Sequence, residues 1–116
     1  MRNAFLCLLL AACWGTDSRI ALDEGKTRDA MEAHHTEALA ARDAVIAGDL
    51  DAARGALRAL STRLPLDGQP EAAQAPLSQA VSAGVVAKDL DAAAIAVGRV
   101  GAACGTCHKT RGVTPP

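Results

Sequence analysis

The sequence has almost no aromatic residues. Its 116 residues include one Phe, one Trp and no Tyr, and these two aromatics, Phe5 and Trp14, both lie near the N-terminus. Half of the residues (50%) are hydrophobic, and alanine is by far the commonest of them. Because alanine buries little apolar area per residue, a small domain of this composition needs a staple or a large cofactor to complete its core.

A strong excess of charge is also lacking. Twelve Lys and Arg face thirteen Asp and Glu, for a net charge of -1, and the sequence has no basic block. Attraction to nucleic acid depends on clustered Lys and Arg, so we predict no nucleic-acid partner. The sequence also shows no nucleophile-base pair and no phosphate-binding loop, and we therefore predict no enzyme activity.

The first twelve residues, "MRNAFLCLLLAA", are typical of an export signal. One positive charge precedes an apolar run that is shorter than the roughly 20 residues needed to span a bilayer. Its end, Leu10-Ala11-Ala12-Cys13, resembles a bacterial lipobox. This resemblance implies cleavage before Cys13, lipidation of the Cys13 thiol and a tether over residues 13–23. We expect a protein on the periplasmic side, anchored to the inner or the outer membrane; the alternative is a plain signal peptide cut near Gly15.

Cysteine is scarce, with four residues in the chain. Cys7 would leave with the signal and Cys13 would be acylated. Cys104 and Cys107 then remain to be explained in an export compartment, where paired cysteines form disulfides or hold cofactors.

The pattern beyond residue 23 predicts an all-α domain over residues 24–112, followed by a tail over residues 113–116. Long Ala- and Leu-rich stretches have helical spacing, and strand-like alternation is lacking. The predicted helices cover residues 24–47, 49–62 and 70–87, the last with a break before Pro76, and a fourth helix starts at Asp89 and carries residues 104–108 at its end. Two hairpins of this kind favour an antiparallel up-down-up-down four-helix bundle. A solenoid of helical repeats is disfavoured, because it needs about three or more repeats.

A short sequence recurs at two of the predicted helix starts. "AGDLDAA" at residues 47–53 corresponds to "AKDLDAA" at residues 87–93. In both copies an Asp stands at the N-cap position and another in the first turn, where the helix dipole favours a negative charge. Either duplication of a helical hairpin or convergence on good capping residues accounts for the similarity of the two segments.

The segment Cys104-Gly105-Thr106-Cys107-His108 is the strongest motif. Cys-x-x-Cys-His is typical of c-type haem attachment. Thiols three residues apart lie on one side of a helix and can reach two vinyl groups of one porphyrin edge, while the next residue supplies an axial imidazole. The same atoms allow a zinc site completed by His34 or His35, a local disulfide, or a redox dithiol.

With this motif at the end of its last predicted helix, the chain resembles the class II c-type cytochromes, the cytochrome c prime group of four-helix monohaem proteins. The resemblance covers residues 23–112 and depends mainly on Cys104, Cys107 and His108. It implies one covalent haem c, His108 as the proximal iron ligand, and single-electron transfer with redox partner proteins. A dimer is compatible with it. Alternatives are a gas-binding or sensing haem protein on the same scaffold, and a haem-free interaction module with a zinc or disulfide clip.

Candidates for the sixth iron ligand lie in "MEAHH", early in the first predicted helix. Met31 is at the centre of an apolar stripe, and the resemblance favours it, because low-spin members of that family use such a Met. His34 and His35 flank it within about one turn. Imidazole is the more common iron ligand, so we predict a His, with His34 ahead of His35 because it shares its side of the helix with Ala38, Ala41 and Val45. Met31 and an open sixth position are the alternatives.

Overall fold

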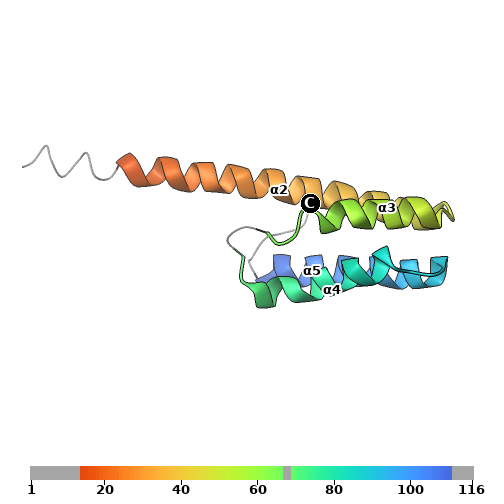
Figure 1. The fold of residues 1–116 in the computed structure, drawn as a ribbon. Coiled ribbons are helices and arrows are strands. Elements are labelled where there is room, and N and C mark those ends of the chain that lie inside the picture. Colours follow the sequence, from red (N-terminus) through yellow and green to blue (C-terminus); the bar gives the residue numbers. More distant parts are fainter. Residues whose placement is uncertain (1–13, 67–68, 111–116) are drawn as a thin grey trace, which may run out of the picture. The chain divides into compact units, whose positions relative to one another are not determined.

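The computed structural model describes residues 14–66 and 69–110, with side chains from Gly25 onward. These residues form four α-helices and no strand: α2 (Trp14–Ile46), α3 (Leu50–Ser61), α4 (Glu71–Val85) and α5 (Leu90–Thr110). Figure 1 shows the four helices in chain order. The predicted all-α four-helix bundle is confirmed. The signal peptide, Cys13 and the tail at residues 113–116 lie outside the described residues.

The chain divides into two units at the boundary between Glu32 and Ala33, within α2. Residues 14–32 of the first unit form the beginning of α2. The second unit contains the end of α2 together with α3, α4 and α5. The core and the candidate site described below all belong to the second unit.

The first helix begins ten residues earlier than predicted, at Trp14 instead of Glu24. Residues 14–23, which the sequence suggested as a tether between the anchor and the domain, are therefore helical. The physical reason is that no proline interrupts this stretch, and a glycine such as Gly25 costs a helix only about 1 kcal/mol relative to alanine.

The two similar segments at residues 47–53 and 87–93 form helix N-caps of the same kind. The Asp49 carboxylate accepts from the Ala52 backbone N–H at 2.9 Å, and the Asp89 carboxylate accepts from the Ala92 N–H at 2.8 Å. Each bond satisfies one of the N–H groups that a helix start leaves without a partner. Both predicted caps are confirmed.

Pro76 does not break α4, contrary to the prediction. The helix runs from Glu71 to Val85 with Pro76 inside it, and Pro70 stands at its N-cap. Pro76 is close to the start of the helix, where a proline disturbs few preceding turns. Tertiary packing of the helix outweighs the one hydrogen bond that the proline cannot donate.

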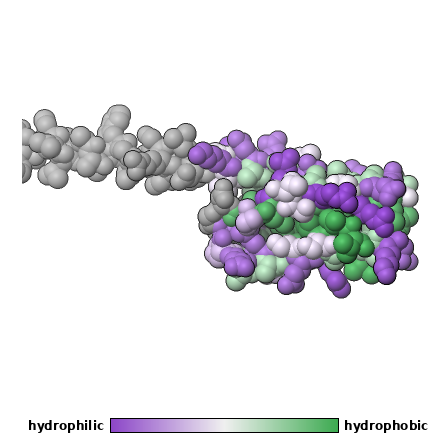
Figure 2. Space-filling model, in the orientation of Figure 1, coloured by the Kyte–Doolittle hydropathy of each residue, from purple (hydrophilic) through white to green (hydrophobic). Residues whose placement is uncertain are grey.

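The core consists largely of small residues. Four large side chains are almost fully buried, Leu57, Leu60, Val81 and Val100, and alanines fill much of the remainder. Some apolar surface stays exposed, including Ile46, Val86 and Ile95, and Figure 2 shows hydrophobic residues on one face among hydrophilic ones. The buried cluster contains Ala41, Leu57, Leu60, Leu77, Ala80, Val81 and Val100.

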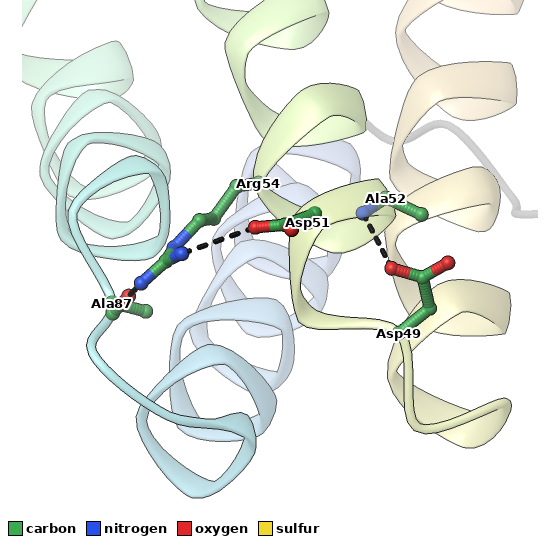
Figure 3. A network of polar contacts seen from close by, with 5 residues as sticks. All are labelled: Asp49, Asp51, Ala52, Arg54 and Ala87. Carbon is green, nitrogen blue, oxygen red and sulfur yellow. Dashed lines mark hydrogen bonds and ion pairs between the residues drawn. The ribbon is translucent and has the colours of Figure 1, made fainter.

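Arg54 joins the start of α3 to the end of α4. Its Nε donates to the Ala87 carbonyl at 2.8 Å, and its second terminal nitrogen donates to the same oxygen. Arg54 also pairs with Asp51 at 3.3 Å, as Figure 3 shows. The Ala87 carbonyl lies just after α4, where carbonyls have no partner in the helix, so the guanidinium supplies the missing donor. The contact fits antiparallel neighbours; the complete up-down-up-down order stays a prediction.

Side chains of α3 and α5 pack closely against α4 at Gly84. A Cβ built there would overlap Leu57 Cδ1 and lie 3.1 Å from Ala96 Cβ. Gly84 is buried, so the neighbouring side chains have little space to move. The absence of a side chain at residue 84 therefore permits this packing.

Replacing Gly84 by alanine is expected to destabilise the fold by about 1–2 kcal/mol, because overpacking outweighs the gain in helix propensity. Urea unfolding followed by circular dichroism measures the change. Gly98→Ala is the matched control, since a Cβ at Gly98 meets no atom within 4 Å, and it should stabilise the protein by a few tenths to about 1 kcal/mol. Equal effects of the two substitutions would show that Gly84 has no special packing role.

Among the described helices, α5 is long and apolar enough to cross a membrane by length and composition alone. A core helix of a soluble bundle passes the same test. Ala93, Ala96 and Val100 of α5 are buried in the second unit. The composition of α5 is therefore compatible with a core role.

Candidate functional site

Cys104, Cys107 and His108 lie together in the last turns of α5. Residues three and four apart share one side of a helix, and the two cysteines extend the buried side formed by Ala96 and Val100. Cys104 packs against the core cluster. All three site residues are half-buried, whereas Val100 is only 2% exposed. The buried side of α5 therefore becomes accessible where the thiols and the imidazole lie.

Threonine hydroxyls stabilise this turn as a helix. Thr110 Oγ1 donates to the carbonyls of Cys107 and Thr106 at 2.9 and 3.1 Å, and Thr106 Oγ1 donates to Ala102 at 3.0 Å. Carbonyls at a helix C-terminus otherwise have no partner within the helix. The Cys107 carbonyl is one of these, and α5 continues through the motif to Thr110, so the two cysteines have their predicted helical spacing.

The two thiols are both free. Burial raises the pKa of the Cys104 thiol, and the charge of an ionised Cys107 raises it further, while a backbone hydrogen bond lowers it in part. Redox dithiols work in the opposite way, because they need a thiol pKa that is lowered at a helix N-terminus or by a nearby cation. Near neutral pH, Cys104 is therefore a protonated thiol in apolar surroundings and a poor nucleophile.

The described residues contain no group of three or more His, Cys, Asp and Glu arranged to hold a metal ion. A tetrahedral zinc site needs its ligands to converge on one atom at about 2.0–2.3 Å. Haem attachment has a different requirement, since the thiols bond to the porphyrin edge and the imidazole to the iron. Two free thiols one turn apart with an adjacent imidazole fit the donor set of a c-type haem.

His34 occupies a different environment from His35. His34 is 7% exposed, and its Nε2 lies 3.2 Å from the Arg63 carbonyl oxygen. His35 is exposed. Met31 belongs to the first unit, whereas His34 and His35 belong to the second. The assignment of the sixth iron ligand to His34, Met31 or His35 therefore stays a prediction.

Sequence reasoning missed the partner of His34. A carbonyl can only accept, so the proton of the imidazole must be on Nε2 for this bond to form. No local pattern relates residue 34 to residue 63, because the contact depends on how α2 and the end of α3 pack. The position of His34 in a stripe with Ala38 and Ala41 was the available signal, and it correctly indicated an inward-facing side chain.

A groove of about 450 Å³ runs between α4 and α5 beside the motif. Small residues line much of it, including Ala73, Ala102 and Ala103. Arg99 is the charged residue among its described lining, and Thr106 brings it next to the cysteines.

We compared the chain with family models, curated proteins and solved structures, and none of them matches it.

Proposed function

We propose that this protein is a monohaem c-type cytochrome that transfers single electrons, with haem bonded through Cys104 and Cys107 and with His108 as the proximal ligand. The observation that carries the proposal is the pair of free, half-buried thiols one helical turn apart beside an imidazole. When bound, the haem would supply a one-electron couple whose potential depends on its axial ligands and surroundings.

The residues of the chain would have separate roles in this proposal. Cys104 and Cys107 would fix the porphyrin edge to α5, and His108 would bind the iron from the following position. A large apolar group beside Val100 and Cys104 would also add volume to a core that is otherwise built on alanine. Cofactor binding and folding stability would then be linked, because a group that binds only the folded chain stabilises it.

The decisive experiment is expression of the complete chain in cells that carry a c-type maturation system, followed by a denaturing gel stained for haem. We expect a stained band at the mass of the mature protein. An exported protein without covalent haem would refute the proposal and leave the haem-free interaction module with a zinc or disulfide clip.

Small-gas binding on the same scaffold is the second candidate. The observation that favours it is the bond between His34 Nε2 and the Arg63 carbonyl, which occupies one predicted distal ligand. Absorption spectra separate the two functions. High-spin bands and immediate uptake of carbon monoxide by the ferrous protein indicate an open sixth position, whereas a stable low-spin spectrum indicates an electron carrier.

Export and lipidation at Cys13 complete the proposal. They depend on the signal-like sequence at residues 1–12 and the resemblance of residues 10–13 to a lipobox. Acyl chains would attach the protein to a membrane, each buried CH₂ contributing about 0.8 kcal/mol. Incorporation of labelled palmitate into the wild-type protein, and its loss in Cys13→Ser, tests this part independently of haem.

A further inference from the structure

The described part of the chain contains two buried polar side chains, His34 and Gln74. Both bond to the segment Arg63–Leu66, which follows α3. His34 Nε2 lies 3.2 Å from the Arg63 carbonyl. The Gln74 amide nitrogen donates to the Leu66 carbonyl at 3.1 Å, and its oxygen accepts from the Leu66 N–H. One buried side chain from α2 and one from α4 thus hold the two ends of the same segment.

Arg63 has a second contact with α2. Its guanidinium pairs with the Glu37 carboxylate at 3.3 Å, and Glu37 is one helical turn beyond His34. The ion pair is partly exposed and contributes little by itself. The bond to His34 is more important, because His34 is 7% exposed and a buried polar group that loses its partner is costly.

The segment and the candidate site both contact the core. Leu64 and Cys104 both pack against the same buried cluster. Leu64, Pro65 and Leu66 also border a pocket of about 680 Å³, which Val81 and Gln74 line as well. The polar bonds at the two ends of the segment therefore add to the apolar packing of Leu64 in holding it.

Nε2 of His34 cannot bond to the Arg63 carbonyl and to a metal at the same time. The carbonyl bond requires a proton on Nε2, whereas a metal bond requires the lone pair of that nitrogen. Ligation through Nε2 would leave the Arg63 carbonyl without this donor and release one end of the segment. The structure therefore uses Nε2 of His34 for the segment, and only Nδ1, the ring nitrogen nearer the backbone, is left for a metal.

We propose that His34 is a positioning residue that holds the Arg63–Leu66 segment, and through it Leu64, against the buried cluster that Cys104 also contacts, and that His34 is not the sixth iron ligand. The part about the iron rests on the proposed haem function. The part about the segment does not, because it concerns bonds within the polypeptide. The two parts can therefore fail separately.

Two substitutions distinguish a positioning residue from a ligand. His34→Gln keeps an N–H donor at a similar reach but removes the imidazole, whereas His34→Leu removes both. His35→Leu is the matched control, because His35 is the exposed neighbour on the same helix. Trypsin provides a direct probe, since it cleaves after arginine and the Arg63–Leu64 bond lies within the segment.

Under native conditions we expect His34→Leu to be cleaved at Arg63–Leu64 roughly 5- to 30-fold faster than the wild type, measured relative to cleavage at Arg58 within α3. His34→Gln should restore slow cleavage, and His35→Leu should match the wild type. Cleavage of His34→Leu at the wild-type rate would overturn the proposal. This measurement can be made on haem-free protein and is valid even if no haem is attached.

On the haem-loaded protein, we expect His34→Gln to keep the absorption spectrum of the wild type, including any low-spin bands. Conversion of His34→Gln from a low-spin to a high-spin spectrum would identify His34 as the ligand and overturn the proposal. If His34→Leu does not fold, the spectrum of His34→Gln still decides the question. A wild-type protein without covalent haem would count against the proposed function alone.

Discussion

Replacing both Cys104 and Cys107 by serine is expected to abolish covalent haem attachment while the four helices stay formed. Serine is close in size to cysteine, and both thiols are only half-buried in α5. Serine hydroxyls do not form the thioether bonds that would hold the porphyrin edge. The stained band on a denaturing gel should disappear completely, and circular dichroism of the helices should persist.

The single substitutions should behave differently from the double one. Cys104→Ser or Cys107→Ser leaves one thioether and one unreacted vinyl group, which extends the conjugation of the porphyrin. We expect a lower yield of attached haem and a reduced-state absorption band displaced to longer wavelength. The measurement is the spectrum of the haem in alkaline pyridine.

Thr106→Ser is the control, because Thr106 is exposed between the two cysteines and is not expected to bond to the haem. It should leave attachment unchanged. Persistence of the stained band in the double serine variant would contradict the assignment of the thiols. Loss of the band in Thr106→Ser would show that the gel reports folding instead of attachment.

Replacing Leu57 by alanine is expected to cost about 2–5 kcal/mol of folding free energy. Leu57 is fully buried and contacts Gly84, where three helices meet. The buried cluster to which it belongs also contains Ala41 and Ala80, and short side chains of this kind cannot extend into a space left behind. The cost should thus lie in the upper part of that range, a large fraction of the 5–15 kcal/mol typical of a native protein.

Urea unfolding of the haem-free double serine variant measures this effect without a contribution from haem. We expect a lower midpoint with an unchanged slope. Ile95→Ala is the control, since Ile95 is 58% exposed, and it should change stability by no more than about 0.5 kcal/mol. Equal losses for the two substitutions would show that Leu57 is not a central core residue. In the loaded wild-type background, bound haem should offset part of the Leu57→Ala cost.

The candidate site was predictable from the sequence to the extent that it is local. Cys104, Cys107 and His108 lie three and four positions apart within five residues of one helix, so their spacing alone indicates a shared side. What could not be predicted is the position of the distal candidates. His34 bonds to a carbonyl 29 residues away, and only the packing of α2 against the end of α3 brings them together.

The sequence by itself determined the all-α class, the helix starts at Asp49 and Asp89, and the motif at the end of α5. Each of these depends on interactions within about one helical turn, such as the bonds from Asp49 to Ala52 and from Asp89 to Ala92. Only the tertiary structure decided the helical continuation through Pro76, the need for glycine at residue 84 and the partner of His34. These depend on contacts between helices, where burial and close packing outweigh the local preferences of the residues.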